Sequence, residues 1–277
     1  MPYRILHVSD LHTGPPFRPA VADDLVRQAH ELAPDLLVIS GDFVQRADFS
    51  AQWRTANALR AALPQPQLVV PGNHDVPLVN AAARLLRPMS AYQRQISADL
   101  NPVFERPGLV VVGANTSHGL TGDGGWLSDG QARVLRHIFG RYDATYYKIV
   151  VWHHPVVNPP NIKRNRVMLG ATKTMRLLDE LAVDMLLCGH VHVGYVSHTS
   201  KHLPGLKRGT LICQSGTTTS RRGYGPEHEQ NTCNLITLDE QTITIQPMRH
   251  NPEQGHFEPT ATHAFRRNAA IVAPHNN

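Results

Sequence analysis

The 277-residue chain has few cysteines, no long apolar segment and no run of like charges. Its three cysteines, an odd number at wide spacings, suit neither a disulfide framework nor a CxxC zinc site. No stretch approaches the roughly 18 consecutive apolar residues of a membrane helix. The N-terminal run RILHVSD contains a histidine, ends in aspartate and lacks a cleavage site, so it does not have the order of a signal peptide. We therefore expect a cytoplasmic protein without a membrane span.

Basic residues exceed acidic ones, but they are scattered along the chain. The formal net charge is +5 and the isoelectric point is near 9.3. This charge favours a small phosphate-ester substrate over nucleic acid, because nucleic-acid binding needs a concentrated basic surface. Five basic residues could contact a phosphate, although we favour a solvated face for them: Lys163, Arg164, Arg166, Arg221 and Arg222.

Histidine is the abundant residue, with 17 copies, and it is the commonest metal ligand in proteins. Five segments place a strand-length apolar run directly before polar, ligand-type residues: ILHVSDLH, DLLVISGD, QLVVPGNHD, KIVVWHHP and DMLLCGHVH. Nearly continuous apolar runs are typical of strands buried on both faces of a sheet. Amphipathic stretches of helical period lie between several of them, which predicts an α/β fold. The five polar clusters should then meet beyond the carboxyl ends of the strands.

The second half of the chain adds three other patterns. Short strand-like runs separated by turn residues predict a second sheet after residue 205. Residues 155–171 are rich in Pro and Asn and predict a long loop over the site. We expect one domain over residues 1–250 and a loosely ordered C-terminal extension over residues 251–277.

Two of the polar clusters repeat one device. Asp10 and His12 lie two positions apart at a strand end, and His190 and His192 do the same in GHVH. Because alternate residues of an extended strand point to the same side, each pair can bind a metal ion. A single pair of this kind is about as likely to arise by chance as to have a function. Two such pairs in one chain favour the functional interpretation. Gly189 would let the second pair approach a neighbouring segment closely.

The other three clusters have ordinary structural explanations when each is taken singly. Asp42 fits a metal-binding carboxylate or a helix N-cap, and GNHD fits a ligand site or a turn. Adjacent strand residues face opposite ways, so only one of His153 and His154 should bind metal, and the pattern does not choose between them. Carboxylates, an amide and imidazoles without a thiolate suit Mn, Fe or Zn. Seven such ligands are about right for two ions that share a carboxylate.

In this order the motifs DxH, GD, GNHD, HHP and GHVH resemble those of the calcineurin-like metallophosphoesterase superfamily, and most closely its bacterial cyclic-nucleotide phosphodiesterase-like branch. The resemblance spans residues 4–192 by motif. A further stretch resembles the family before its fourth motif, at Gly125, Leu127, Gln131 and Leu135. The resemblance implies an α/β fold, a four-layer α/β/β/α sandwich of two mixed sheets flanked by helices, with the site at the sheet edges.

The resemblance also implies a role for each site residue. Three residues bind the first metal, three bind the second and one bridges both, and these are Asp10, His12 and His192; Asn73, His153 and His190; and Asp42. His153 is preferred to His154 because the family ligand stands two residues before the proline. His74 would contact the phosphate and protonate the leaving group, and Asp75 would orient His74. Substrate contacts are expected from Asn73, His74, His192 and Asn115.

The implied function is that of a hydrolase, a phosphodiesterase that cleaves a small phosphodiester such as a cyclic nucleotide. The implied mechanism is in-line attack by a hydroxide that bridges two manganese, iron or zinc ions. A phosphomonoesterase or pyrophosphatase would use the same site. A nuclease or a non-enzymatic interaction scaffold is less favoured, because the chain lacks a basic stripe and keeps every site residue.

Substrate choice is the point at which the chain departs from the pattern. Many cyclic-nucleotide members carry an acidic residue shortly after the GD motif, where this chain reads Phe43, Val44, Gln45 and Arg46. The metal ligands are unaffected by this difference. A homo-oligomer is compatible with the sequence, which does not predict one.

Overall fold

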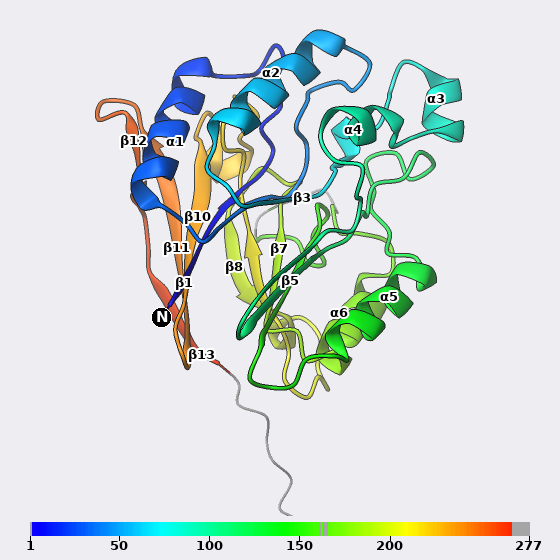
Figure 1. The fold of residues 1–277 in the computed structure, drawn as a ribbon, viewed down its shortest axis with the longest axis vertical. Coiled ribbons are helices and arrows are strands. Elements are labelled where there is room, and N and C mark those ends of the chain that lie inside the picture. Colours follow the sequence, from blue (N-terminus) through cyan, green and yellow to red (C-terminus); the bar gives the residue numbers. More distant parts are fainter. Residues whose placement is uncertain (1, 161, 163–165, 268–277) are drawn as a thin grey trace, which may run out of the picture.

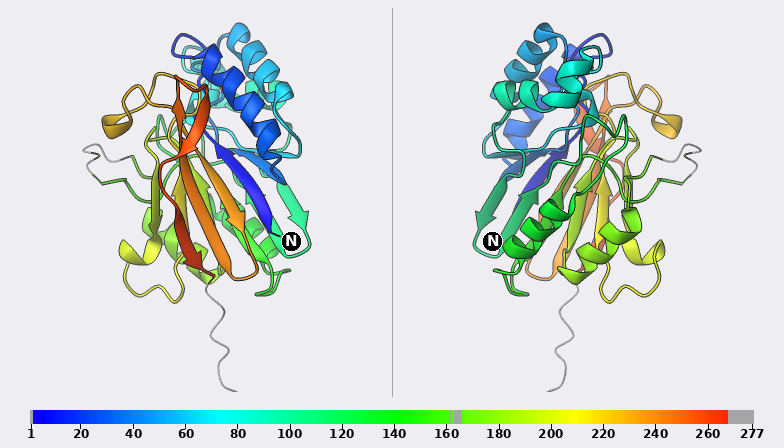
Figure 2. Two further views of the ribbon diagram at one scale, coloured as in Figure 1. Left: turned by 90° about the vertical axis from the view of Figure 1, so that its left-hand side faces the viewer. Right: turned by 90° about the vertical axis from the view of Figure 1, so that its right-hand side faces the viewer.

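Two β-sheets packed face to face form the centre of the molecule in the computed structural model, which describes residues 2–160, 162 and 166–267. Helices lie outside both sheets, as the views in Figures 1 and 2 show. The predicted α/β fold of two mixed sheets flanked by helices is therefore confirmed. Among the described residues, no helix combines the length and the apolar composition needed to cross a bilayer.

The first sheet has the order β12-β11-β10-β1-β2-β3, and β13 also pairs with β11. Its strands are β1 (Tyr3–Val8), β2 (Leu36–Ile39), β3 (Gln67–Val69), β10 (Thr232–Leu238), β11 (Thr242–Asn251), β12 (His256–Pro259) and β13 (His263–Arg266). The strands β1, β2 and β3 run parallel, while β10 pairs with β1 in the antiparallel sense. Helices α1 (Pro19–Leu32) and α2 (Ser50–Ala62) follow β1 and β2 and pack against this sheet.

The second sheet has the order β4-β5-β6-β7-β9-β8. Its strands are β4 (Val103–Arg106), β5 (Leu109–Gly113), β6 (Tyr147–Val151), β7 (Met185–Cys188), β8 (Tyr195–His198) and β9 (Leu211–Gln214). The central strands β5, β6, β7 and β9 are parallel, and α5 (Asp129–Phe139) and α6 (Ala171–Glu180) cover their outer face. Two short helices, α3 (Ala81–Leu86) and α4 (Ser90–Gln95), lie in the connection between the sheets.

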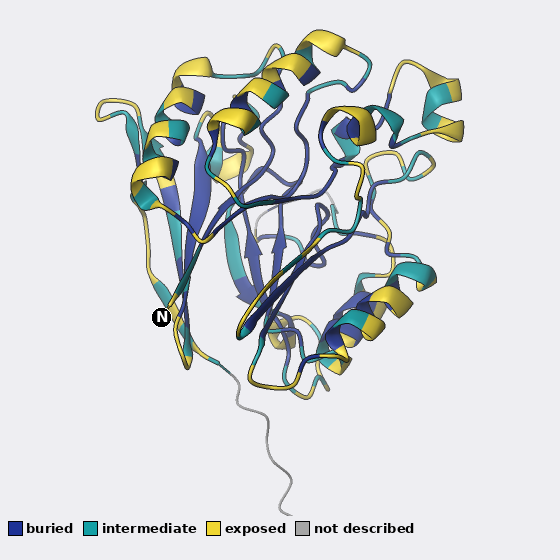
Figure 3. Cartoon of the chain, in the orientation of Figure 1, coloured by how far each residue is buried: buried dark blue, intermediate teal, exposed yellow. Residues whose placement is uncertain are grey.

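Strand residues alternate between two hydrophobic layers, which explains the continuous apolar runs of the sequence. Ile5 and Val38 of the first sheet face Val111 and Ile149 of the second sheet, between the sheets. Their neighbours along the strands, such as Leu37, pack against the helices instead. Figure 3 shows the strands buried and the outward helix faces exposed. Because both faces are covered, the polar loops at the carboxyl ends of the strands hold the chemically active side chains.

The C-terminal residues differ from the sequence prediction of a loosely ordered extension. Strand β12 pairs with residues 248–251 of β11, and β13 pairs with residues 242–245. Few apolar residues mark these strands, because one side of them is exposed and only Phe257 is fully buried. Residues 268–277 lie outside the described residues, and the domain boundary at residue 250 stays a prediction.

Candidate metal centre

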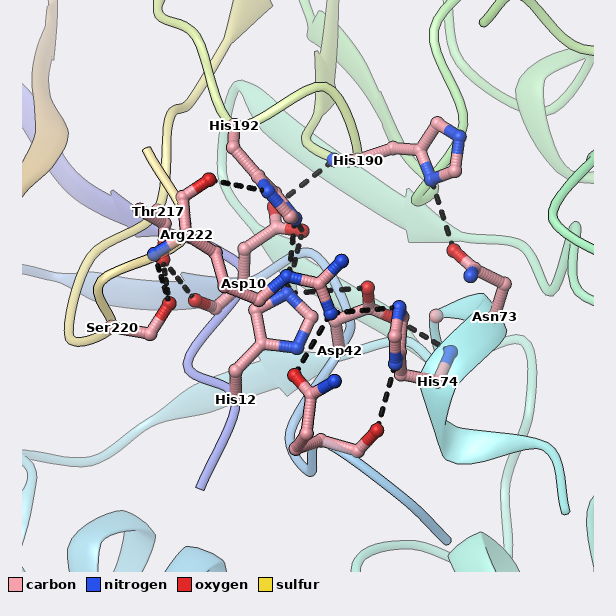
Figure 4. Close-up of polar contacts among 12 residues, drawn as sticks. Asp10, His12, Asp42, Asn73, His74, His190, His192, Thr217, Ser220 and Arg222 are labelled. Atoms are coloured by element: carbon pink, nitrogen blue, oxygen red, sulfur yellow. Dashed lines mark hydrogen bonds and ion pairs between the residues drawn. The ribbon is translucent and has the colours of Figure 1, made fainter. Parts of the chain in front are cut away.

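Seven polar side chains meet where the two sheets come together. They follow the carboxyl ends of β1, β2, β3, β6 and β7, and in that order they are Asp10 and His12; Asp42; Asn73; His153; and His190 and His192. All are buried except Asn73, which is half-buried. Figure 4 shows Asp10, His12, Asp42 and His192 turned toward one another, with Asn73 and His190 beside them. The fold thus gathers the predicted ligands into one cluster, while their role as ligands stays a prediction.

Five of these residues reach the cluster through left-handed backbone. The φ angles are 54° at Asp10, 47° at His12, 55° at Asp42, 77° at His190 and 61° at His192. An extended strand was expected to direct Asp10 and His12 to the same side, but β1 ends before both residues. Left-handed backbone costs roughly 1–3 kcal/mol at a residue other than glycine, and it persists where surrounding contacts enforce it. The cluster is therefore held in place by its surroundings.

Four ligand atoms form the first group. The Nε2 atoms of His12 and His192 lie 3.0 Å apart. Asp10 Oδ1 lies 3.5 Å from the first of these nitrogens and 3.1 Å from the second, and Asp42 Oδ2 lies 3.5 Å from His12 Nε2. Metal–ligand bonds of about 2.1 Å separate neighbouring ligand atoms by roughly 3.0–3.4 Å. One cation therefore fits among these atoms.

The second group shares Asp42 with the first. Asn73 Oδ1 lies 3.1 Å from His153 Nε2 and 2.9 Å from His190 Nδ1. Asp42 Oδ2 lies 3.4 Å from His153 Nε2, so the oxygen that faces His12 also faces this group. A carboxylate in this position can bridge two cations.

Both carboxylates are held through one oxygen and present the other oxygen bare. Asp10 Oδ2 accepts from the Ser9 hydroxyl at 2.6 Å and from the His190 backbone N–H at 3.0 Å. Asp42 Oδ1 accepts from the His74 backbone N–H at 2.8 Å. Within the described part of the chain, Asp10 Oδ1 and Asp42 Oδ2 are buried and make no hydrogen bond. Imidazole Nε2 atoms lie 3.1–3.5 Å from these two oxygens, and a cation bound among these atoms would neutralise both carboxylates.

Backbone carbonyls orient two of the imidazole rings so that Nε2 faces the cluster. His153 Nδ1 donates to the Ser40 carbonyl, and His192 Nδ1 donates to the Arg222 carbonyl, each at 2.8 Å. A proton on Nδ1 leaves the Nε2 lone pair free to bind a metal. Burial outweighs the attraction of Asp10 and Asp42 and lowers the pKa of His12 to about 3. Against the effect of burial, Asp42 and Asp10 raise the pKa of His153 to about 9, so a metal ion bound here would take the place of a proton on that ring. A cluster of imidazole nitrogens and carboxylate oxygens suits Mn, Fe or Zn.

Manganese is expected to raise the melting temperature (Tm) of protein that has been stripped with EDTA and dialysed. A site filled at a hundred times its Kd contributes about 2.7 kcal/mol. In a domain of this size about 1 kcal/mol raises the Tm by roughly 2–4 °C, so we expect roughly 5–10 °C per occupied site. Calcium, which prefers all-oxygen sites, is the control and should have little effect. A Tm that millimolar manganese leaves unchanged would contradict a built metal site.

The structure corrects the predicted role of Asp75, which does not contact the His74 ring. Asp75 Oδ1 accepts from the backbone N–H groups of Phe43 and Val44, at 2.9 and 3.2 Å. Its Oδ2 accepts from the Gly72 N–H at 2.8 Å. The carboxylate therefore joins the loop after β2 to the loop after β3, and it supports the ligands on both loops.

Asp75→Asn is expected to destabilise the protein by about 1–3 kcal/mol, because the amide must turn an N–H group toward a backbone donor. The midpoint of urea unfolding measures this loss. Asp23 lies exposed on α1, so Asp23→Asn is the matched control and should not move the midpoint. Equal midpoints for both variants would mean that the two loops do not depend on Asp75.

The His74 ring lies between two arginines. Its Nδ1 lies 2.8 Å from the Gln45 carbonyl oxygen and 3.0 Å from Arg46 Nη1, and its Nε2 lies 3.1 Å from Arg222 Nη1. The carbonyl is the acceptor among these three, so Nδ1 donates to it and Nε2 accepts from Arg222. Burial, opposed by Asp42 and assisted by Arg222, lowers the pKa of His74. These contacts indicate a neutral ring, whereas the resemblance implied a proton donor.

Arg222 itself corrects a second expectation, that of a solvated face. Its guanidinium is half-buried, and Figure 4 shows it reaching across the cluster toward His74. No run or motif marks Arg222 in the sequence. Of the other basic residues weighed above, Lys163 and Arg164 lie outside the described residues.

Two further candidates lie beside the cluster. Asn115 hydrogen-bonds to Ser117 and Gln131 rather than to a predicted ligand, so its contact with substrate stays a prediction. His154 Nδ1 pairs with Thr116 Oγ1 at 2.9 Å, although its ring also lies near His190, with 4.7 Å between the ring centroids. His153 is the member of the HHP motif that faces Asp42.

Comparison with protein families gives a match over most of the chain. The model described as calcineurin-like phosphoesterase matches residues 3–194. No match is found among curated proteins.

Comparison with solved structures gives the same fold at low identity. The purple acid phosphatase PPD1 from yellow lupin (Lupinus luteus) seeds is 12% identical with a TM-score of 0.71, and the match covers 96% of this chain and 54% of the lupin chain, about half its length. A dimetal phosphatase from Danio rerio is 13% identical with a TM-score of 0.69, covering 96% and 99%. GAP50, the anchor in the inner membrane complex of Plasmodium, is 14% identical with a TM-score of 0.60, covering 96% and 89%. These likenesses concern the fold alone.

Proposed function

The chain belongs to the calcineurin-like phosphoesterase family, and from this premise we propose that it is a hydrolase that cleaves a small phosphodiester at two metal ions. The observation that carries the proposal is the pair of buried carboxylates, Asp10 and Asp42. Each has a bare oxygen that faces imidazole nitrogens. Cations bound among these oxygens and nitrogens would neutralise both buried carboxylates.

We propose the following division of the ligands, which rests on the two groups of ligand atoms. The first ion would be held by Asp10, His12 and His192, the second by Asn73, His153 and His190, and both by Asp42. When bound, the ions supply Lewis acidity and lower the pKa of a water toward neutrality. The metal identity among Mn, Fe and Zn is left to elemental analysis.

The chain's own residues orient this centre and the substrate. Ser9 and the His74 backbone N–H fix the two carboxylates, and the carbonyls of Ser40 and Arg222 fix two rings. The Arg222 guanidinium, which Figure 4 places over the cluster, would donate to non-bridging phosphate oxygens. Fixed donors of this kind stabilise charge that develops in the transition state.

The test compares bis(4-nitrophenyl) phosphate with 4-nitrophenyl phosphate, using protein stripped with EDTA and reloaded with manganese. We expect the diester to be hydrolysed with the higher kcat/KM and the stripped protein to be inactive on both. Preference for the monoester would identify a phosphomonoesterase instead. If protein that holds two ions per chain cleaves neither substrate, an interaction scaffold becomes the better proposal.

A further inference from the structure

Two arginines, Arg46 and Arg222, lie beside His74 and contact its ring. Arg46 Nη1 contacts the Gln45 carbonyl and the His74 ring, and Arg222 Nη1 contacts Gln45 Oε1 at 2.8 Å and the same ring. Over residues 2–160, 162 and 166–267, neither guanidinium forms an ion pair with a carboxylate. Both side chains are half-buried. The contacts given above for the two guanidiniums are therefore to neutral groups, namely Gln45 and the His74 ring.

Partly buried cations normally have an anion beside them, because desolvation of an unpaired charge is costly. Asp42 and Asp10 attract Arg222, but over the described residues neither carboxylate forms an ion pair with its guanidinium. Asp10 and Asp42 would already be occupied in balancing two divalent ions. A substrate with a single negative charge would therefore leave one guanidinium without a counter-charge.

A cavity of about 260 Å³ continues from the metal centre past Arg46. Asn73 and His74 line it on the side of the cluster, Val76 and Leu78 are its apolar lining, and its other lining residues are Arg84, Gly122 and Asp123. The volume suits a small organic group rather than a polymer. Arg46 lines this cavity, and Arg222 contacts the other nitrogen of the His74 ring.

From this arrangement we propose that Arg46 and Arg222 form a subsite for a second phosphoryl group, so that the substrate is an organic diphosphate diester, RO–PO₂–O–PO₂–OR′. The inference rests on the proposed hydrolytic function and names its substrate class. The scissile phosphoryl lies at the ions, and the neighbouring phosphoryl lies between the guanidiniums, whose planar forks match phosphate oxygens.

The reaction is then hydrolysis of the P–O–P bridge. A bond forms between a water oxygen and the scissile phosphorus, and the bridging P–O bond breaks, with its electron pair leaving on the second phosphoryl. The products are two phosphate monoesters. The two protons of the attacking water pass to these phosphates or to the solvent. A phosphate leaving group needs no proton donor, which agrees with a His74 Nε2 that accepts from Arg222.

The first arm of the test measures binding. Calorimetry with the diphenyl ester of methylenediphosphonate, whose P–C–P bridge is not hydrolysed, is run on manganese-loaded protein. We expect Arg46→Gln and Arg222→Gln each to weaken binding by about tenfold or more, as for a lost hydrogen bond to a charged group. Arg221→Gln is the matched control, because Arg221 is the exposed neighbour, and it should bind as the wild type does. Unchanged binding in both Gln variants would overturn the proposal.

The second arm measures selectivity between bis(4-nitrophenyl) diphosphate and bis(4-nitrophenyl) phosphate, which differ by one phosphoryl group. The ratio of their kcat/KM values should favour the diphosphate in the wild type and in Arg221→Gln, and it should fall about tenfold or more in either Gln variant. Arg222→Lys keeps the charge without the planar fork, so it guards against misfolding and should give an intermediate ratio. A ratio that is the same in all variants would overturn the subsite, whereas tight binding without turnover of either ester would overturn the hydrolytic function alone.

Discussion

Asp42→Asn is expected to lower kcat/KM by at least about 1,000-fold and to reduce the bound metal from two ions per chain to one or none. Asp42 Oδ2 lies 3.5 Å from His12 Nε2 and 3.4 Å from His153 Nε2, so one oxygen faces both ligand groups. In the variant, the His74 backbone N–H would still hold the amide oxygen at the Oδ1 position. The NH₂ group would then face both ions without charge or lone pair. We expect the loss of the bridging carboxylate to raise the activation free energy by several kcal/mol. Each increase of about 1.4 kcal/mol lowers the rate tenfold, which gives the stated factor.

A second measurement separates this effect from misfolding. The metal-free Asp42→Asn protein should still unfold in one cooperative transition, at a lower temperature than the metal-free wild type. Burial disfavours the Asp42 carboxylate, but His153 and His74 outweigh it and hold the pKa of Asp42 well below its usual range, and the amide loses this attraction. Asp23→Asn, on the exposed side of α1, is the control and should keep both ions and full activity. If Asp42→Asn retains two ions and loses less than about tenfold in activity, Asp42 does not bridge the centre.

The strands and the meeting of the polar clusters could be predicted because one physical cause produced both signals. A parallel strand covered on both faces needs apolar residues at every position, as in β2 and β7, where all residues are buried. Polar residues can follow only where such a strand ends. The carboxyl ends of neighbouring parallel strands share one edge, so the pattern predicts that Asp10 and Asp42, which follow β1 and β2, lie close together. The approach of His190, which follows β7 of the other sheet, depends on how the two sheets pack.

The backbone of the site could not be predicted in the same way. Asp10 and His12 converge through left-handed backbone rather than through strand alternation, and this conformation depends on long-range bonds. The Asp10 N–H donates to the Gly41 carbonyl and the His12 N–H to the Asp42 carbonyl, each at 3.0 Å. A motif read along the chain does not contain these partners.

The roles of Asp75 and Arg222 were missed for a related reason. Adjacency suggested that Asp75 serves His74, but a side chain on a short turn can as well face backward, and this one binds three backbone N–H groups. Arg222 lies far from the ligands in sequence, and its approach to His74 exists only in the folded chain. Site residues that lie outside the sequence motifs can therefore be identified only from side-chain contacts in the folded structure.

Gly189→Ala is expected to destabilise the protein by at least about 2 kcal/mol and to reduce metal binding, because a Cβ at this position would overlap Ser9 Oγ and Asp10 Oδ2. Gly189 directly follows β7 of the second sheet, Ser9 and Asp10 directly follow β1 of the first, and the Gly189 N–H donates to the His153 carbonyl at 2.9 Å. This contact therefore fixes the position of the ligands of the first sheet relative to the ligands of the second sheet.

Gly130→Ala is the matched control for this variant. Gly130 lies in α5, where an added Cβ has open space and no atom nearer than 3.7 Å, so alanine should be neutral or stabilise by roughly 0.5–1 kcal/mol. Urea unfolding and elemental analysis of both variants measure the two effects. A Gly189→Ala protein that binds two ions with wild-type stability would mean that the sheets can shift at this contact, and that the spacing of the ligand groups is set by the ions rather than by the fold.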